Sequence, residues 1–178
     1  MAESGMSVEL QKAIDCLRIR DVYLRSSSSY LVDDFDPKYS PEANDLAVQF
    51  KHVVTRGEVL ALKEDDTDIR IFRVYIDLGA RWVVLPESTS ENGSDESDDE
   101  ADVKAVIEAT FLAEYLMENE PGQDALDAFA LKNASYHVWP YWREYLMNQC
   151  MRMNLPKIAL PTVQFAANNN ESAGSVGQ

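Results

Sequence analysis

The stretch VKAVIEATFLAEYL, residues 103–116, decides the fold, because it can be read either as a helix or as a strand. Its alanine, glutamate and leucine content favours a helix. The opposite indication comes from an unbroken apolar row at every second position: Val103, Ala105, Ile107, Ala109, Phe111, Ala113 and Tyr115. The intervening row, from Lys104 to Leu116, is mixed. Such an alternation is typical of a strand with one buried face, and it outweighs the propensity. We therefore predict a long strand.

Two further strands precede this segment and are joined by an acidic turn. Residues 46–62 are predicted to be a strand whose first half places four apolar side chains on one face: Leu46, Val48, Phe50 and Val54. The segment EDDTD, residues 64–68, turns the chain. Residues 69–85 are rich in β-branched and aromatic residues and form the next strand. Gly79 lies inside it, where an isolated glycine indicates a bulge or bend.

A shorter strand is predicted at residues 19–24, IRDVYL, which alternate before they meet the serine run Ser26–Ser29. The serines are expected to enter a loop that continues to residue 45, because two prolines and five acidic residues there disfavour a regular element. This loop nevertheless contains four large apolar side chains that need a surface to dock on: Tyr30, Leu31, Phe35 and Tyr39.

Helices are predicted before and after the strands. One short helix covers residues 7–18, a second covers residues 123–132, and a longer one covers residues 136–152. Pro140 is expected near the first turn of the longer helix, where its missing N–H costs little. Residues 155–165 contain two prolines and should form an extended arm.

The predicted fold class is therefore α+β: a four-stranded antiparallel sheet with a long helix packed on one face, plus a short N-terminal helix. Residues 1–165 should form a single domain. Within it, residues 86–102 contain no basic residue and are expected to be a flexible acidic loop. Residues 166–178 are small and polar, and a disordered C-terminal tail is expected there.

Composition limits the partners. The formal net charge is −15, from 31 acidic and 16 basic residues. This balance disfavours nucleic acid and anionic membrane surfaces, since both require a basic footprint. The start of the chain lacks the pattern of a secretory signal, and no apolar run approaches the roughly 18 residues of a membrane span. With only two separated cysteines, the expectation is a soluble protein in the reducing cytoplasm.

Catalytic and metal-binding patterns are weak. His52 and His137 have no cysteine or carboxylate at ligand spacing, and Cys16 and Cys150 show no reactive motif. Phosphate-binding glycine loops of the two common kinds are missing from the sequence. We expect a protein that is not an enzyme and that uses no metal and no cofactor. A small enzymatic or ligand-binding α+β domain remains open as an alternative of another class.

The C-terminal third carries a family resemblance. Its motif is P-Y-x-R-E at Pro140, Tyr141, Arg143 and Glu144, followed by Asn154-Leu155-Pro156 and by Leu160-Pro161 with Phe165. Together with the strand order and the Ile19-Arg20-Asp21 strand, this pattern resembles the SecB family of chaperones over residues 19–165.

The resemblance implies an ATP-independent holding chaperone that binds unfolded client proteins. Such proteins are homotetramers, built as dimers of dimers with the long helices sandwiched between sheets. Clients bind there in extended form along apolar grooves near the loop between the first two strands. Seven residues of this chain are the candidate client-binding residues: Tyr30, Leu31, Phe35, Tyr39, Leu46, Val48 and Phe50. The alternative is that these residues are ordinary core or subunit interface, a reading that is stronger for the strand residues than for the loop aromatics.

Four aromatic residues of the long helix are expected to serve the core or the oligomer interface: Trp139, Tyr141, Trp142 and Tyr145. Asp21 is the candidate contact for SecA, the translocase motor that export-type members dock on acidic sheet positions. The later acidic position is Arg25 here, and the tail after Phe165 lacks the pattern of a second long helix. Two roles therefore stand side by side: delivery of preproteins for protein export, and a dedicated antitoxin chaperone of a toxin–antitoxin system without SecA.

Overall fold

The computed structural model describes residues 7–85 and 101–160. Its elements follow the chain in this order: α1 (Val8–Cys16), β1 (Leu17–Leu31), the 3₁₀-helix η1 (Pro41–Asn44), β2 (Ala47–Glu64), β3 (Thr67–Val84), β4 (Asp102–Met117), α2 (Gln123–Lys132) and α3 (Ala134–Arg152). The predicted α+β fold is confirmed, including the four antiparallel strands, the long helix and the short N-terminal helix.

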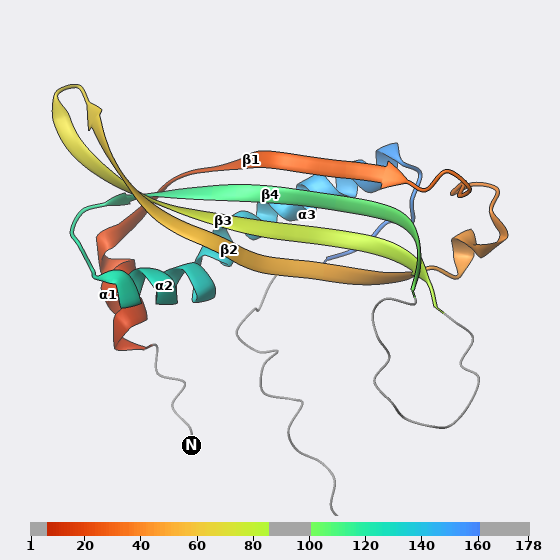
Figure 1. Cartoon of the computed structure of the whole chain (residues 1–178), viewed down its shortest axis with the longest axis horizontal. Helices are drawn as coiled ribbons and strands as arrows, with labels where there is room; N and C mark the ends of the chain where they lie inside the picture. Colours follow the sequence, from red (N-terminus) through yellow and green to blue (C-terminus); the bar gives the residue numbers. More distant parts are fainter. Residues whose placement is uncertain (1–6, 86–100, 161–178) are drawn as a thin grey trace, which may run out of the picture.

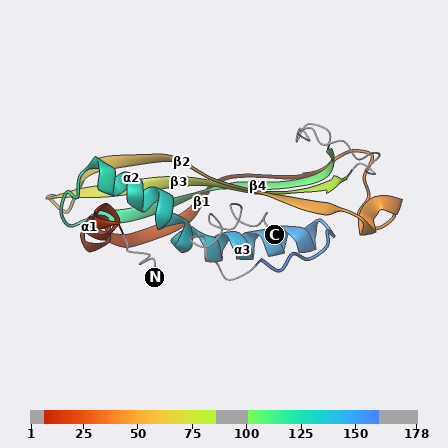
Figure 2. The same cartoon turned by 90° about the horizontal axis from the view of Figure 1, so that it is seen from below.

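The four strands form one sheet in the order β1-β4-β3-β2, with every neighbouring pair antiparallel. The sheet is long and twisted, and α3 runs along one of its faces (Figures 1 and 2). We call this face the helix side and the opposite one the open face. The segment that decides the fold is β4, a central strand, and its apolar row at odd positions from Ala105 to Tyr115 lies in the core. Alternation thus prevailed over helix propensity, because only a strand can bury that row against α3.

The predicted loop at the serine run is wrong. β1 continues through Ser26–Ser29 to Leu31, and Ser26 pairs with Thr110 while Ser29 pairs with Ile107. The reason is that β4 supplies a complete backbone partner along the whole length of β1. Because β1 is an edge strand whose serines are exposed on both faces, small polar side chains are tolerated there.

The expected bulge at Gly79 is also wrong. Gly79 pairs in regular register with Lys51 on β2 and with Glu108 on β4. A Cβ at this position would lie 3.3 Å from Lys51 Cβ and 3.3 Å from Glu108 Cγ. The glycine therefore makes room for two neighbouring side chains rather than bending the strand.

Pro140 does not lie in the first turn, because α3 begins at Ala134 and places it as an interior residue. Its ring removes one backbone hydrogen bond of the helix, and a bend is the usual consequence. Beyond α3, residues 155–160 have no regular structure, as an extended arm requires, with Leu155 and Leu160 buried. The rest of that arm, residues 86–100 of the acidic loop and the tail 166–178 lie outside the described residues.

Aromatic and histidine side chains fix α3 to the sheet. Tyr115 of β4 lies edge-on to Phe129 of α2, with ring centroids 4.8 Å apart, and its hydroxyl shares a 2.9 Å hydrogen bond with His137 Nδ1. Burial lowers the pKa of His137 and raises that of Tyr115, so both groups stay neutral near pH 7. The start of α3 is thus held by a neutral polar contact inside an aromatic cluster.

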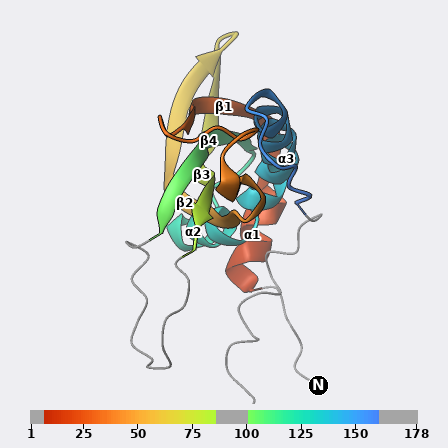
Figure 3. The same cartoon turned by 90° about the vertical axis from the view of Figure 1, so that its right-hand side faces the viewer.

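Residues 32–46, which we call the connection, join β1 to β2 at one end of the sheet (Figure 3). Phe35 is inserted into the core with 5% of its surface exposed. Asp36 then organises a tight turn, because its carbonyl accepts the N–H groups of Tyr39 and Ser40. The connection is therefore an ordered surface element whose shape is fixed by its own hydrogen bonds.

Candidate functional site

The seven predicted client-binding residues fall into three environments. Phe35 lies in the core. Leu31, Leu46 and Val48 are half-buried, and all three pack against the core. The remaining aromatics are accessible: Tyr30 at 51%, Tyr39 at 82% and Phe50 at 55% of their surface. The structure thus leaves three aromatic side chains at the end of the sheet that carries the connection.

On the helix side, β2 carries an apolar strip, formed by Val48, Phe50 and Val54, that the helices leave partly uncovered. α3 packs mainly on β4, β1 and β3, and α2 reaches β2. Register with β3 places Val48, Phe50 and Val54 on the face of the core residues, yet Phe50 stays more than half exposed. β2 is also an edge strand, so within the described chain its outer row of backbone N–H and C=O groups has no neighbouring strand. An apolar strip beside a free strand edge can pair with an extended peptide.

His52 lies next to Phe50 and connects this strip to the helix. Its Nε2 shares a 2.7 Å hydrogen bond with Ser135 Oγ at the start of α3. Burial lowers the pKa of His52, which keeps the imidazole neutral at pH 7. The contact fixes the position of β2 relative to the first turn of α3.

A hollow of about 710 Å³ lies where β1, β2, β3 and β4 run side by side near the connection. Gly79 forms part of its floor, and Tyr30 and Phe50 are both in its lining, together with Val53 and Val106. We call it the Gly79 hollow. Its lining is mixed, because Lys51, Arg81 and Glu108 also belong to it. It includes two of the predicted client-binding residues, Phe50 from the helix-side row of β2 and Tyr30 from the open-face row of β1, whereas Tyr39 does not line it.

The open face carries paired charges, both in this hollow and beyond it. Arg73 Nε donates to Glu114 Oε1 over 2.7 Å, and the Tyr23 hydroxyl donates to the same oxygen over 3.1 Å. Lys51 and Glu108 lie 3.5 Å apart across Gly79. Asp21 is exposed on this face beside Glu114, and its Oδ1 accepts the backbone N–H of Val22. Glu108 and Glu114, which lie on the same face as Asp21, therefore each have a basic partner.

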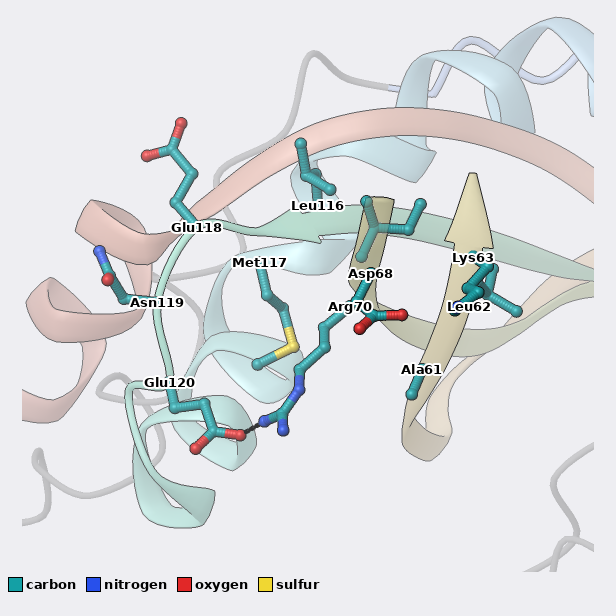
Figure 4. Close-up of a pocket in the computed structure, with 11 residues that line it drawn as sticks. Ala61, Leu62, Lys63, Asp68, Arg70, Leu116, Met117, Glu118, Asn119 and Glu120 are labelled. Carbon is teal, nitrogen blue, oxygen red and sulfur yellow. Dashed lines mark ion pairs between the residues drawn. The ribbon is translucent and has the colours of Figure 1, made fainter. Parts of the chain in front are cut away.

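A larger hollow, of about 840 Å³, lies at the opposite end of the sheet and is drawn in Figure 4. The β2–β3 hairpin projects at this end of the sheet (Figure 1). The hollow is lined by residues 61–63, 68–70 and 116–120, and Arg70 forms an ion pair with Glu120 at its rim. It contains no predicted client-binding residue. We therefore place the candidate site at the Gly79 end.

The four aromatic residues of α3 that were expected in the core or at an oligomer interface differ in burial. Trp142 is fully in the core, and Tyr145 stacks on it with centroids 6.1 Å apart while lying edge-on to Phe111. Trp139 is half-buried against the core. Tyr141 points outward with 48% of its surface exposed, on the same outer face as Met147 and Met151.

Comparison with known proteins gives one kind of match. No protein-family model and no curated protein sequence matches the chain. Among solved structures, a SecB-like chaperone of Mycobacterium tuberculosis, Rv1957, in complex with a ChAD peptide from the HigA1 antitoxin Rv1956, superposes with a TM-score of 0.61. The two chains are 19% identical, and the match covers 89% of this chain and 98% of that one. This chain has a SecB-like fold.

The described residues contain neither a membrane-spanning helix nor a group of metal ligands. None of the helices in the described ranges is long and apolar enough to cross a membrane. Within residues 7–85 and 101–160, no three His, Cys, Asp or Glu side chains are grouped as a metal site.

Sequence reasoning missed the open-face contribution to the site. Val53 and Val106 line the Gly79 hollow but belong to the rows of β2 and β4 that alternate away from the core. The mixed row of residues 104–116 was the available signal: its Val, Thr and Leu residues indicate a face that is only partly solvated.

Proposed function

We propose that this protein is an ATP-independent holding chaperone that binds extended, apolar segments of unfolded client proteins along β2 and beside the connection. The observation that carries the proposal is the half-exposed Phe50 on an edge strand, next to the Gly79 hollow with Tyr30 and Val53. The SecB-like fold supports it, because the described neighbour was solved with a peptide from an antitoxin.

The physical logic is that of a tolerant binder. Backbone pairing along a strand edge is independent of client sequence, and apolar hollows accept many side chains. Each large apolar client side chain that becomes buried contributes roughly 1.5–3 kcal/mol, from which the cost of ordering the client must be subtracted. A homotetramer would raise the modest affinity of one site by presenting several sites to one long client. The exposed outer face of α3, with Tyr141, Met147 and Met151, supports assembly through this helix.

An antitoxin is the client class that we favour over exported preproteins. Docking on SecA through Asp21 would need an accessible acidic face, whereas Glu108 and Glu114 on this face are already paired with Lys51 and Arg73. We therefore propose a cytoplasmic, non-enzymatic chaperone without a SecA-linked export role. A pull-down with purified SecA at low salt tests this point: binding that is lost in Asp21→Asn would restore the export role.

Replacing Phe50 by aspartate is expected to weaken client binding by roughly tenfold to a hundredfold, because it removes one apolar anchor and adds a charge. The measurement is fluorescence anisotropy with a labelled globular protein that has been reduced and alkylated so that it stays unfolded. Since Phe50 is more than half exposed, the midpoint of thermal unfolding should stay nearly unchanged.

The matched control is Leu131→Asp on α2, which changes a large apolar side chain that lies outside the candidate site and has 65% of its surface exposed. It should bind the unfolded protein as the wild type does. Undiminished affinity of a folded Phe50→Asp variant, or equal losses in both variants, would place the client surface elsewhere.

A further inference from the structure

Lys104 occupies a special backbone position on β4. The register between β3 and β4 runs from Trp82–Ala105 to Val83–Val103, so Lys104 is an extra residue in the ladder, as in a β-bulge. On its other side, the Lys104 carbonyl accepts the N–H of Val32, the first residue of the connection. A bulge redirects the side chain of its extra residue. Here Lys104 lies at the end of the sheet where the connection begins.

The ammonium of Lys104 lies among three carboxylates from different segments. Its Nζ is 3.0 Å from Asp102 on β4, 3.7 Å from Glu42 in η1 and 4.0 Å from Asp34. Only 10% of the lysine side chain is exposed. The hydrogen bond to Asp102 raises the pKa of Lys104, so the ammonium stays charged at neutral pH. The two connection carboxylates come from the stretches before and after the Asp36 turn.

The connection has an excess of negative charge that a nearby cation offsets. It contains five acidic residues and one base, Lys38, in a protein whose net charge is −15. Mutual repulsion among these acids favours an expanded chain. On the core side, Phe35 fixes the connection by apolar burial. Asp34 and Glu42 contact the sheet through the same lysine, which draws together the two sides of the turn that presents Tyr39.

We propose that Lys104 is the positioning residue of the client site: its ammonium holds the connection against the end of the sheet and so fixes the turn that presents Tyr39. This inference rests on the proposed function for its binding consequence, whereas its structural half is independent of it. Preorganisation of a binding surface reduces the ordering cost of association, so a loosened connection binds clients more weakly.

The test uses Lys104→Met, which keeps the length of the stem and removes the charge, with Lys104→Arg as the conservative rescue. Hydrogen exchange is followed at four amides of the connection that donate backbone hydrogen bonds: Tyr39, Ser40, Ala43 and Asp45. In Lys104→Met their exchange should accelerate about fivefold or more while amides of β3 stay protected. Affinity for the reduced and alkylated unfolded protein should fall about threefold, and Lys104→Arg should restore both values.

Lys12→Met is the matched control, because it removes a lysine paired with Glu9 at 2.8 Å on α1 and changes the net charge equally. It should alter neither readout. In the wild type, raising the salt from about 0.05 to 0.5 M should accelerate exchange of the connection selectively, and Lys104→Met should lack this response.

Unchanged exchange of the connection in Lys104→Met, or an equal change in Lys12→Met, would overturn the inference. Faster exchange with full client affinity would overturn the positioning role alone. If the wild type does not bind the unfolded protein, the proposed function fails, and the exchange experiment still decides whether Lys104 holds the connection.

Discussion

Replacing Trp142 by alanine is expected to lower the free energy of unfolding by about 3–5 kcal/mol. The side chain has 1% of its surface exposed and stacks on Tyr145 between α3 and the sheet. Its removal leaves a cavity that Tyr145 cannot move to fill, because Tyr145 also packs edge-on against Phe111. Denaturant unfolding followed by circular dichroism provides the measurement.

Tyr141→Ala is the natural control for that experiment, since it truncates the preceding residue of the same helix, where 48% of the side chain is exposed. It should cost less than about 1 kcal/mol. Similar losses for Trp142→Ala and Tyr141→Ala would mean that α3 does not pack on the sheet through the face described above.

Phe35→Ala is expected to lower the free energy of unfolding by about 3 kcal/mol, because Phe35 is buried in the core and is the aromatic anchor of the connection. The substitution should also accelerate exchange of the Tyr39 and Ser40 amides, whose turn follows directly. Differential scanning calorimetry and hydrogen exchange on the same sample measure the two effects.

Phe35→Leu separates packing from client recognition, since it keeps most of the apolar volume. It should retain most of the stability and all of the client affinity. A loss of client affinity in a stable Phe35→Leu variant would show that this ring contacts clients directly, contrary to its position in the core.

The sheet could be predicted from sequence because its central strands have clear strand patterns in the amino-acid sequence. β4 alternates without interruption, and the register with β3 buries the predicted row. The edge strand β1 could not be predicted at full length, because the partner that orders Ser26–Ser29 lies about eighty residues away in the chain. A local pattern contains no information about such a partner.

The site was predictable only in part. The sequence identifies aromatics between the first two strands, but burial depends on the path of the chain: Phe35 turns inward whereas Tyr39, four residues later, is left in solvent. The role of Lys104 depends on a β-bulge that the residue types in the sequence do not indicate. Both features arise from tertiary geometry, at the place where the candidate function is concentrated.

The most direct test of the central claim is to find where an unfolded client lies on this protein. A photo-crosslinking side chain is introduced at position 50 on β2, at position 39 in the connection, or at position 131 on α2, and each variant is mixed with the reduced and alkylated unfolded protein. Positions 50 and 39 should crosslink strongly, and position 131 should stay at background. Background yields at positions 50 and 39, or client crosslinks concentrated at position 131, would contradict a client surface along β2 and the connection.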